Sequence, residues 1–124
     1  MMSMAIQQTI YEARKAALTQ LRDKSNLADL ADDAIFQELL NRCQGVFEMS
    51  DREVADVLMV SRPTINRWSN GKNLPHRRVR KSVFSWISDT ASKRLRILEK
   101  YEGANARQGL KAQAWEYVYP GVAV

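Results

Sequence analysis

The residues best suited to chemistry lie in one stretch, SRPTINRWSNGKNLPHRRVRK, from Ser61 to Lys81. This stretch holds seven Lys or Arg and no Asp or Glu. Its guanidinium, ammonium and amide groups offer positive charge and hydrogen-bond donors rather than a nucleophile beside a base. A basic segment in a folded region is typical of a protein that binds a polyanion. Because a solvated basic face that keeps the protein soluble has the same composition, charge alone leaves both readings open.

The rest of the chain limits the class of protein. A length of 124 residues fits one domain, and an apolar fraction of 45% argues against global disorder. The apolar runs are too short to span a bilayer, and the N-terminal residues lack the pattern of an export signal. The single cysteine excludes an internal disulfide and a cysteine-cluster zinc site. We therefore expect no membrane association and a cytoplasmic, nucleoid-associated location.

The apolar pattern is helical nearly throughout, which predicts an all-α fold. Residues 1–25 have an apolar face at helical spacing and predict an N-terminal helix for packing or dimerisation. The sequence RDKSN interrupts this helix, and we expect Ser25 or Asn26 to cap a second helix that Gly45 ends. A long helix is predicted from His76 to Glu102, followed by an apolar tail that we expect to be a short helix or an extended arm.

One face of the long helix carries apolar residues at near-heptad spacing. They are Phe84, Ile87, Ala91, Leu95 and Leu98. This seam and the N-terminal helix are candidates for a dimer interface, and both are equally compatible with enclosing the core of a single chain.

Two short helices are predicted on either side of Met59 and Val60. Ser50 and Glu53 form a capping box at the start of the first helix, which we expect from Asp51 to about Leu58. Ser61 is a suitable N-cap for the second helix, residues 62–70, and Gly71 marks its end. Two such helices joined by a tight turn form a helix-turn-helix.

The inner faces of these helices carry apolar residues, which leaves a polar face on the second helix. That face comprises Ser61, Arg62, Pro63, Asn66, Arg67 and Asn70. The DNA major groove admits one α-helix, and Arg and Asn form bidentate hydrogen bonds with guanine and adenine edges.

The segment from Leu39 to Pro75 resembles the lambda-repressor-like, or Cro-type, helix-turn-helix family. The matching features are Ala55, Val60-Ser61 at the turn, Ile65, and the pattern W-x-x-G-x-x-x-P from Trp68 to Pro75. The resemblance covers roughly a third of the chain and implies a compact bundle whose second motif helix enters the major groove, with dimers on two half-sites. Met59 departs from the family, which prefers glycine there.

The resemblance also implies roles for individual residues. Arg62, Asn66 and Arg67 occupy base-reading positions of the family, and we add the adjoining Pro63. Ser61, Thr64, Lys72 and Asn73 occupy positions that hold phosphate oxygens, and we add Asn70. Asp51 stands where the family often has a neutral polar residue near the DNA backbone.

Four further cations, Arg77, Arg78, Arg80 and Lys81, start the long helix. Positive side chains at the positive end of a helix are unfavourable, so a compensating anion is expected. We predict contacts with DNA phosphates, with simple solvation as the alternative.

Other chemistry-bearing residues receive structural interpretations. We expect Trp68 and Cys43 in the core, Trp86 half-buried, and His76 in a flanking backbone role. Asp29, Asp32 and Asp33 are interpreted as a solvated acidic patch. No catalytic set, metal cluster or phosphate-binding glycine loop is visible, so neither an enzyme, a cofactor nor a metal is predicted.

These observations predict a compact all-α bundle of four or five helices, with an extra N-terminal helix, a long C-terminal helix and a short apolar tail. Residues 26–88 form the DNA-binding domain, with the motif at 50–71, and residues 89–124 serve dimerisation or partner binding. The expected function is that of a bacterial or phage transcriptional regulator, such as a repressor. It would bind double-stranded DNA as a homodimer on a near-palindromic operator.

The alternative is a DNA-targeting interaction protein. An antitoxin or a phage or plasmid accessory factor would bind a partner protein through the arm Trp115 to Val124.

Overall fold

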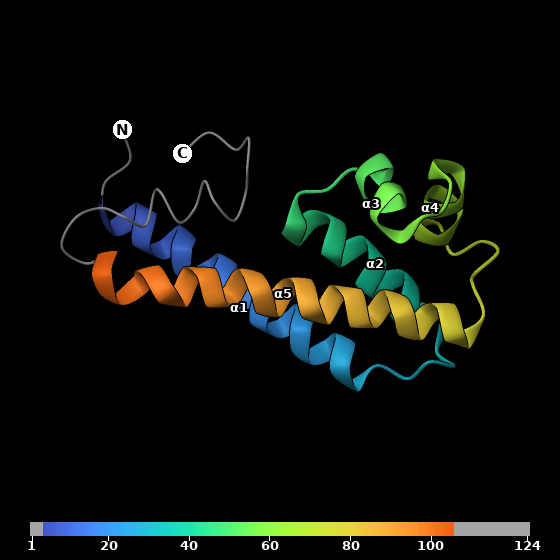
Figure 1. Cartoon of the computed structure of the whole chain (residues 1–124), viewed down its shortest axis with the longest axis horizontal. Coiled ribbons are helices and arrows are strands. Elements are labelled where there is room, and N and C mark those ends of the chain that lie inside the picture. Colours follow the sequence, from blue (N-terminus) through green and yellow to red (C-terminus); the bar gives the residue numbers. More distant parts are fainter. Residues whose placement is uncertain (1–3, 106–124) are drawn as a thin grey trace.

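A computed structural model describes residues 4–105, and the apolar arm lies outside this range. The described chain forms five helices and no strand, which confirms the predicted all-α fold with a long C-terminal helix. In Figure 1, α5 runs the length of the molecule beside α1, and the shorter helices gather over one half of α5. The helices are α1 (Met4–Leu27), α2 (Asp33–Phe47), α3 (Asp51–Leu58), α4 (Arg62–Ser69) and α5 (Arg77–Asn105).

The two long helices, α1 and α5, pack against each other. Tyr11, Leu18 and Leu21 supply the buried face of α1. The Tyr11 hydroxyl donates a 2.6 Å hydrogen bond to the carbonyl oxygen of Leu98, so the buried ring has a partner for its polar atom. The sequence pattern predicts an apolar face of Ile6, Ile10, Ala13, Ala17 and Leu21. In the structure this face is rotated, because Tyr11 takes the inner position and Ile6 is 52% exposed.

The near-heptad seam of α5 is fully used within one chain. All five of its members are buried among the described residues: Phe84, Ile87, Ala91, Leu95 and Leu98. The sequence left two roles open for this seam, a dimer interface or the core of a single chain. In the structure the seam forms part of the core of a single chain. A homodimer would therefore need a different surface.

The boundary between α1 and α2 differs from the prediction. The first helix continues through Ser25 and Asn26 to Leu27, and Asp32 rather than either of them caps α2, accepting a hydrogen bond from the Ile35 amide. Asn26 instead contacts α5. Its side-chain oxygen accepts a 2.7 Å hydrogen bond from the Ser88 hydroxyl.

The predicted end of α2 was also wrong. Gly45 lies inside α2, and Glu48, in the left-handed region at φ 56°, forms the C-cap. This extension by one turn carries Phe47 into the core, where its ring meets that of Trp86 at 5.8 Å. Burial of an aromatic side chain outweighs the modest helix penalty of one glycine.

The core beneath the short helices is built around Phe36 of α2. Its ring lies 5.8 Å from the rings of both Trp68 in α4 and Phe84 in α5, at interplanar angles of 75° and 57°. Edge-to-face and tilted contacts of this kind are favourable beyond the area that they bury. They fix α4 to the body of the protein while leaving its opposite side uncovered.

Candidate nucleic-acid interface

The first short helix is set by its N-terminal residues. The Ser50 hydroxyl accepts a hydrogen bond from the Glu53 amide, while the Glu53 carboxylate accepts one from the Ser50 amide. This reciprocal pair confirms the predicted capping box and starts α3 at Asp51. Val54 and Ala55, on the inner face of α3, are buried. The capping box and the burial of Val54 and Ala55 therefore fix the position of Asp51 in the first turn of α3.

A three-residue turn connects α3 to α4. Met59 adopts the left-handed conformation at φ 59° and ψ 41°, and the residue is 90% exposed. The Val60 amide donates to the Ala55 carbonyl, and the Ser61 hydroxyl then accepts from the Thr64 amide as the N-cap of α4. The chain thus forms the tight turn that glycine would favour, although a methionine occupies the strained position.

The inner side of α4 is anchored at two residues. Ile65 is fully buried and Trp68 is 6% exposed, as the sequence predicted. The Trp68 indole Nε1 donates a 3.1 Å hydrogen bond to the carbonyl oxygen of Asn73, which ties the following loop to the helix. Gly71, at φ 75°, begins that loop, and a Cβ there would lie 2.9 Å from the Gln37 side-chain oxygen. This close approach supports the predicted use of glycine at the helix end.

The polar face of α4 is exposed. The four predicted base-reading residues, Arg62, Pro63, Asn66 and Arg67, line a single shallow surface depression together with Asp51 of α3. Arg and Asn side chains on an exposed helix face can reach the base edges in the major groove of DNA, which is wide enough to admit one α-helix. The structure therefore brings together all four residues that the sequence assigned to base contacts, and it adds a carboxylate.

Hydroxyl groups support part of this face. The Ser61 and Thr64 hydroxyl oxygens lie 2.7 Å apart, and Arg67 Nη2 donates to Thr64 Oγ1 at 3.2 Å. Asn70 is the C-cap residue, and its Nδ2 donates to the Asn66 carbonyl at 2.9 Å. The predicted phosphate-contact residues Ser61, Thr64 and Asn70 thus lie beside the base-reading residues, and two of them, Thr64 and Asn70, form hydrogen bonds with Arg67 and Asn66.

Amide side chains of α2 hold the end of α4. Both Gln37 Nε2 and Asn41 Nδ2 donate 3.0 Å hydrogen bonds to the carbonyl oxygen of Ser69. A third amide, Gln44, accepts from the Ser69 hydroxyl at 3.1 Å. Carbonyls at a helix end need such partners. Sequence reasoning missed this clamp, although Gln37, Asn41 and Gln44 follow helical spacing along one side of α2.

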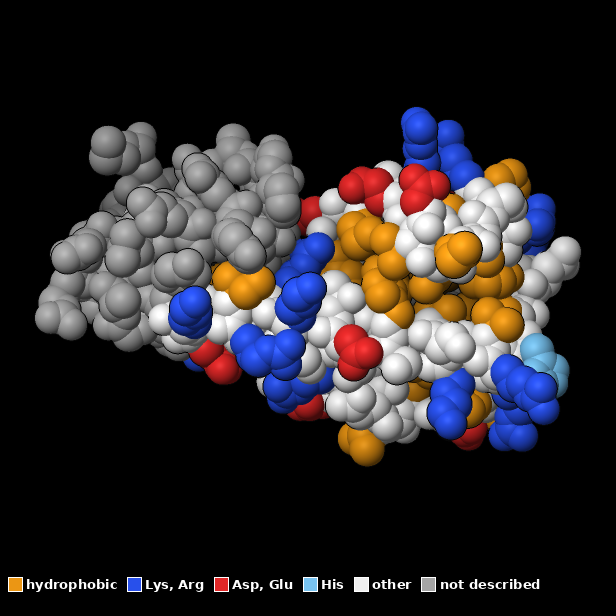
Figure 2. All heavy atoms as spheres, viewed as in Figure 1, with side chains coloured by type: hydrophobic (Ala, Val, Ile, Leu, Met, Phe, Trp, Pro, Cys, Tyr) orange, Lys and Arg blue, Asp and Glu red, His pale blue; other side chains and the backbone are white. Residues whose placement is uncertain are grey.

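The basic flank begins after α4. Lys72, Asn73, Arg77, Arg78 and Lys81 are exposed, as phosphate contacts require. Figure 2 shows Lys and Arg side chains beside the histidine at the end of the molecule where α5 begins. These cations extend the positive charge of α4 onto the neighbouring helix.

Arg80 does not belong to this flank, which corrects one predicted phosphate contact. Its side chain is buried, with 8% of the residue exposed. The guanidinium donates to the Pro75 and Leu30 carbonyls at 2.8 Å and 3.2 Å, and it lies 2.8 Å from the Asp33 carboxylate. The compensating anion expected at the start of the long helix is therefore, for this cation, a carboxylate of the protein itself.

Asp29, Asp32 and Asp33 are exposed, as predicted for a solvated acidic patch, and each also makes a structural contact. Asp32 caps α2, Asp33 pairs with Arg80, and the Asp29 carboxylate accepts from the Ala31 amide. His76 lies directly before α5, and its Nδ1 accepts a hydrogen bond from the Arg78 amide.

Cys43 is a core residue, as predicted, and its Sγ donates to the Leu40 carbonyl. Burial raises the pKa of the Cys43 thiol to about 12, because desolvation disfavours the thiolate. The thiol is therefore protonated at neutral pH and offers neither a nucleophile nor a metal ligand.

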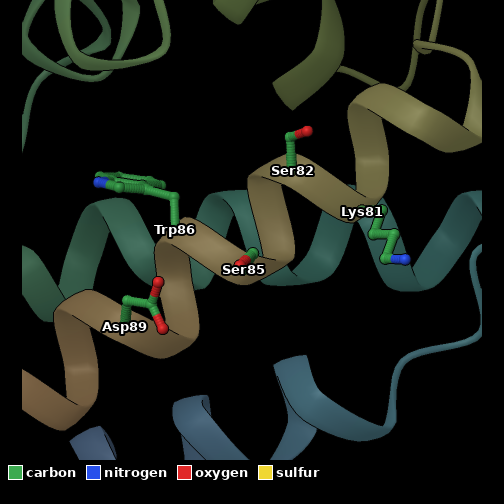
Figure 3. Close-up of a pocket in the computed structure, with 5 residues that line it drawn as sticks. All are labelled: Lys81, Ser82, Ser85, Trp86 and Asp89. Carbon is green, nitrogen blue, oxygen red and sulfur yellow. The ribbon is translucent and has the colours of Figure 1, made fainter.

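A second depression lies on α5, lined by Lys81, Ser82, Ser85, Trp86 and Asp89. In Figure 3 these side chains come from successive turns of the helix and point in different directions. Trp86 is half-buried, as expected. Small-molecule sites usually have polar groups that converge, and the side chains of this depression do not.

Among residues 4–105, no three or more metal-ligating side chains are grouped so that they could hold a metal ion. None of the helices described is both long enough and apolar enough to cross a membrane. Comparison with protein-family models, curated proteins and solved structures finds no match to this chain.

Proposed function

We propose that this protein is a sequence-specific regulator of transcription that binds double-stranded DNA through α4. The observation that supports the proposal is the shared depression of Arg62, Pro63, Asn66 and Arg67 on a helix whose opposite side is anchored in the core. A rigid, exposed helix with Arg and Asn side chains suits direct reading of base edges in the major groove.

The flanking charges supply the second component of binding. Lys72, Arg77, Arg78 and Lys81 are exposed on the segment that follows α4. Such cations bind phosphates regardless of sequence and release counterions from DNA, which makes affinity fall steeply with salt concentration. In specific DNA binding, phosphate contacts position the protein and base contacts select the sequence. The exposed cations would provide the first kind of contact and α4 the second.

We further propose that two copies bind a near-palindromic operator. A single short recognition helix contacts few base pairs, and a symmetric pair raises affinity through effective concentration. The α5 seam is already buried within one chain, so this dimer would form through another surface. Light scattering of the full chain, free and with DNA, measures how many copies bind.

Selection from a random pool of duplex DNA tests the function. The full chain is incubated with the pool at two salt concentrations, and bound fragments are sequenced. We expect enrichment of a short motif repeated with two-fold symmetry, and weaker binding of all fragments at the higher salt. Binding of no fragment, or binding without any enriched motif at either salt, would contradict the proposal.

A further inference from the structure

A carboxylate lies within the otherwise basic surface of α4. Asp51, at the start of α3, lines the same depression as Arg62, Asn66 and Arg67. One of its oxygens, Oδ1, accepts a 2.6 Å hydrogen bond from Gln44 Nε2, while Oδ2 lies 3.5 Å from Asn66 Nδ2. The first oxygen is therefore held by α2, and the second lies toward α4 with one long contact.

The position of Asp51 is fixed by a chain of polar contacts. Gln44 contacts Asp51 through its amide nitrogen, and its amide oxygen accepts from the Ser69 hydroxyl at 3.1 Å. Side chains from α2, α3 and α4 thus hold the carboxylate. A group that is ordered before binding loses little conformational entropy when it meets a partner, so Asp51 is prepared to accept a hydrogen bond from a ligand.

The chemistry of a carboxylate restricts what that ligand group can be. An ionised carboxylate only accepts hydrogen bonds, and it is repelled by phosphate oxygens. The donors on base edges in the major groove are the exocyclic amino groups of cytosine and adenine, and acidic side chains accept from cytosine N4. A carboxylate at this place opposes phosphate binding and favours a base that carries an amino group.

We propose that Asp51 is a specificity-determining residue that accepts a hydrogen bond from the N4 amino group of a cytosine in the operator. This inference rests on the proposed DNA-binding function and adds a base preference to it. Asp51 would read its base directly from α3, next to the bases that Arg62 and Asn66 read from α4.

A different role for Asp51 would be to orient Asn66. In that case the carboxylate would touch no base, and its removal would disturb only the base pair that Asn66 reads. The two roles predict different positions of altered preference along the operator, so the Asn66→Ala variant separates them.

The test compares four forms of the full chain in the same random-pool selection. They are the parent, Asp51→Asn, Asn66→Ala and the charge control Asp56→Asn. Asparagine keeps an oxygen for Gln44 but presents a donor that opposes a cytosine amino group. Asp56 is exposed on the same helix and does not line the depression, so its neutralisation reports the effect of net charge alone.

We expect the parent and Asp56→Asn to prefer cytosine at one position of each half-site, by about tenfold over other bases. Asp51→Asn should lose that preference while Asn66→Ala keeps it and loses another. Binding of random DNA should strengthen in both Asp51→Asn and Asp56→Asn, since each removes one negative charge, and more in Asp51→Asn, because Asp51 lies within the depression.

Two outcomes would overturn this inference while the proposed function stands. In the first, Asp51→Asn selects the same motif as the parent. In the second, Asp51→Asn and Asn66→Ala relax the same base pair. A parent protein that selects no motif at all would instead remove the proposed function, and the inference with it.

Discussion

The guanidinium of Arg80 in α5 lies 2.8 Å from the carboxylate of Asp33 at the start of α2. The same guanidinium donates to the carbonyls of Leu30 and Pro75, and it lies 5.6 Å from the centre of the Phe36 ring. One side chain therefore connects the loop before α2, the loop before α5 and the aromatic core beneath α4. Its removal should affect the folding of the domain before it affects DNA.

We predict that Arg80→Ala lowers the free energy of unfolding by about 1–3 kcal/mol, because two loop carbonyls lose their donor and the packing on Phe36 is lost. Urea unfolding measures this change. Arg78→Ala, at an exposed position two residues earlier, should change stability by less than about 0.5 kcal/mol. Equal stabilities of the two variants would show that the buried contacts of Arg80 contribute nothing.

The exposed cations and the α4 residues should have separable effects on DNA binding. We predict that Arg78→Ala weakens binding to all sequences alike and reduces the slope of log affinity against log salt by about 0.9, the value for one phosphate contact. Asn66→Ala and Arg67→Ala should each cost about 1–3 kcal/mol on the selected operator and little on random DNA.

Fluorescence titrations of each variant with the selected operator and with a scrambled duplex, at several salt concentrations, measure both effects. Asp56→Asn controls for changes in charge away from the depression. Operator affinity of Asn66→Ala and Arg67→Ala equal to that of the parent would remove α4 from the base-reading role.

The turn between α3 and α4 has a strained backbone at Met59, and a substitution by glycine should relieve this strain. Met59 is in the left-handed region at φ 59°, and the residue is 90% exposed. Glycine adopts this conformation without the steric penalty of a side chain, so Met59→Gly should raise the free energy of unfolding by about 1 kcal/mol. Val60→Gly, one residue later, should instead destabilise, because Val60 packs against the core. Urea unfolding of both variants decides this, and a loss of stability in Met59→Gly would contradict the strain.

The short helices were predictable from sequence because their signals are local. Ser50 with Glu53 marks the start of α3, and Ser61 and Gly71 mark the start and the end of α4, all within a few residues of the helix ends. The spacing of Ile65 and Trp68 then leaves Arg62, Asn66 and Arg67 on the uncovered side. Exposure of the candidate site could thus be predicted, although its ligand remains a prediction.

The features that were missed depend on partners distant in sequence. The boundary between α1 and α2 is set with the help of Ser88, which contacts Asn26 across 62 residues. Arg80 was grouped with its basic neighbours because of its charge. The spacing could have predicted that Arg80 is buried. Arg80 lies four residues before Phe84 and seven before Ile87, which places it on the apolar side of the long helix.

Cys43 gives a prediction about pH. Burial disfavours the thiolate and raises the pKa of the thiol in the folded protein from its ordinary value of 9.0 to about 12. Between these values the unfolded chain loses the thiol proton while the folded protein retains it, so stability falls as pH rises above about 9. The contribution of one such group approaches about 1.4 kcal/mol for each pH unit within this window.

Measuring urea unfolding of the parent and of Cys43→Ala at pH 8, 9, 10 and 10.5 isolates this effect of the thiol, since every other residue is common to both proteins. Cys43→Ala should be less stable at pH 8 because of the lost core volume. The difference between the two proteins should then shrink as the pH rises. A difference that stays constant across this range would mean that the folded thiol ionises as readily as the unfolded one, and that Cys43 is not shielded from water.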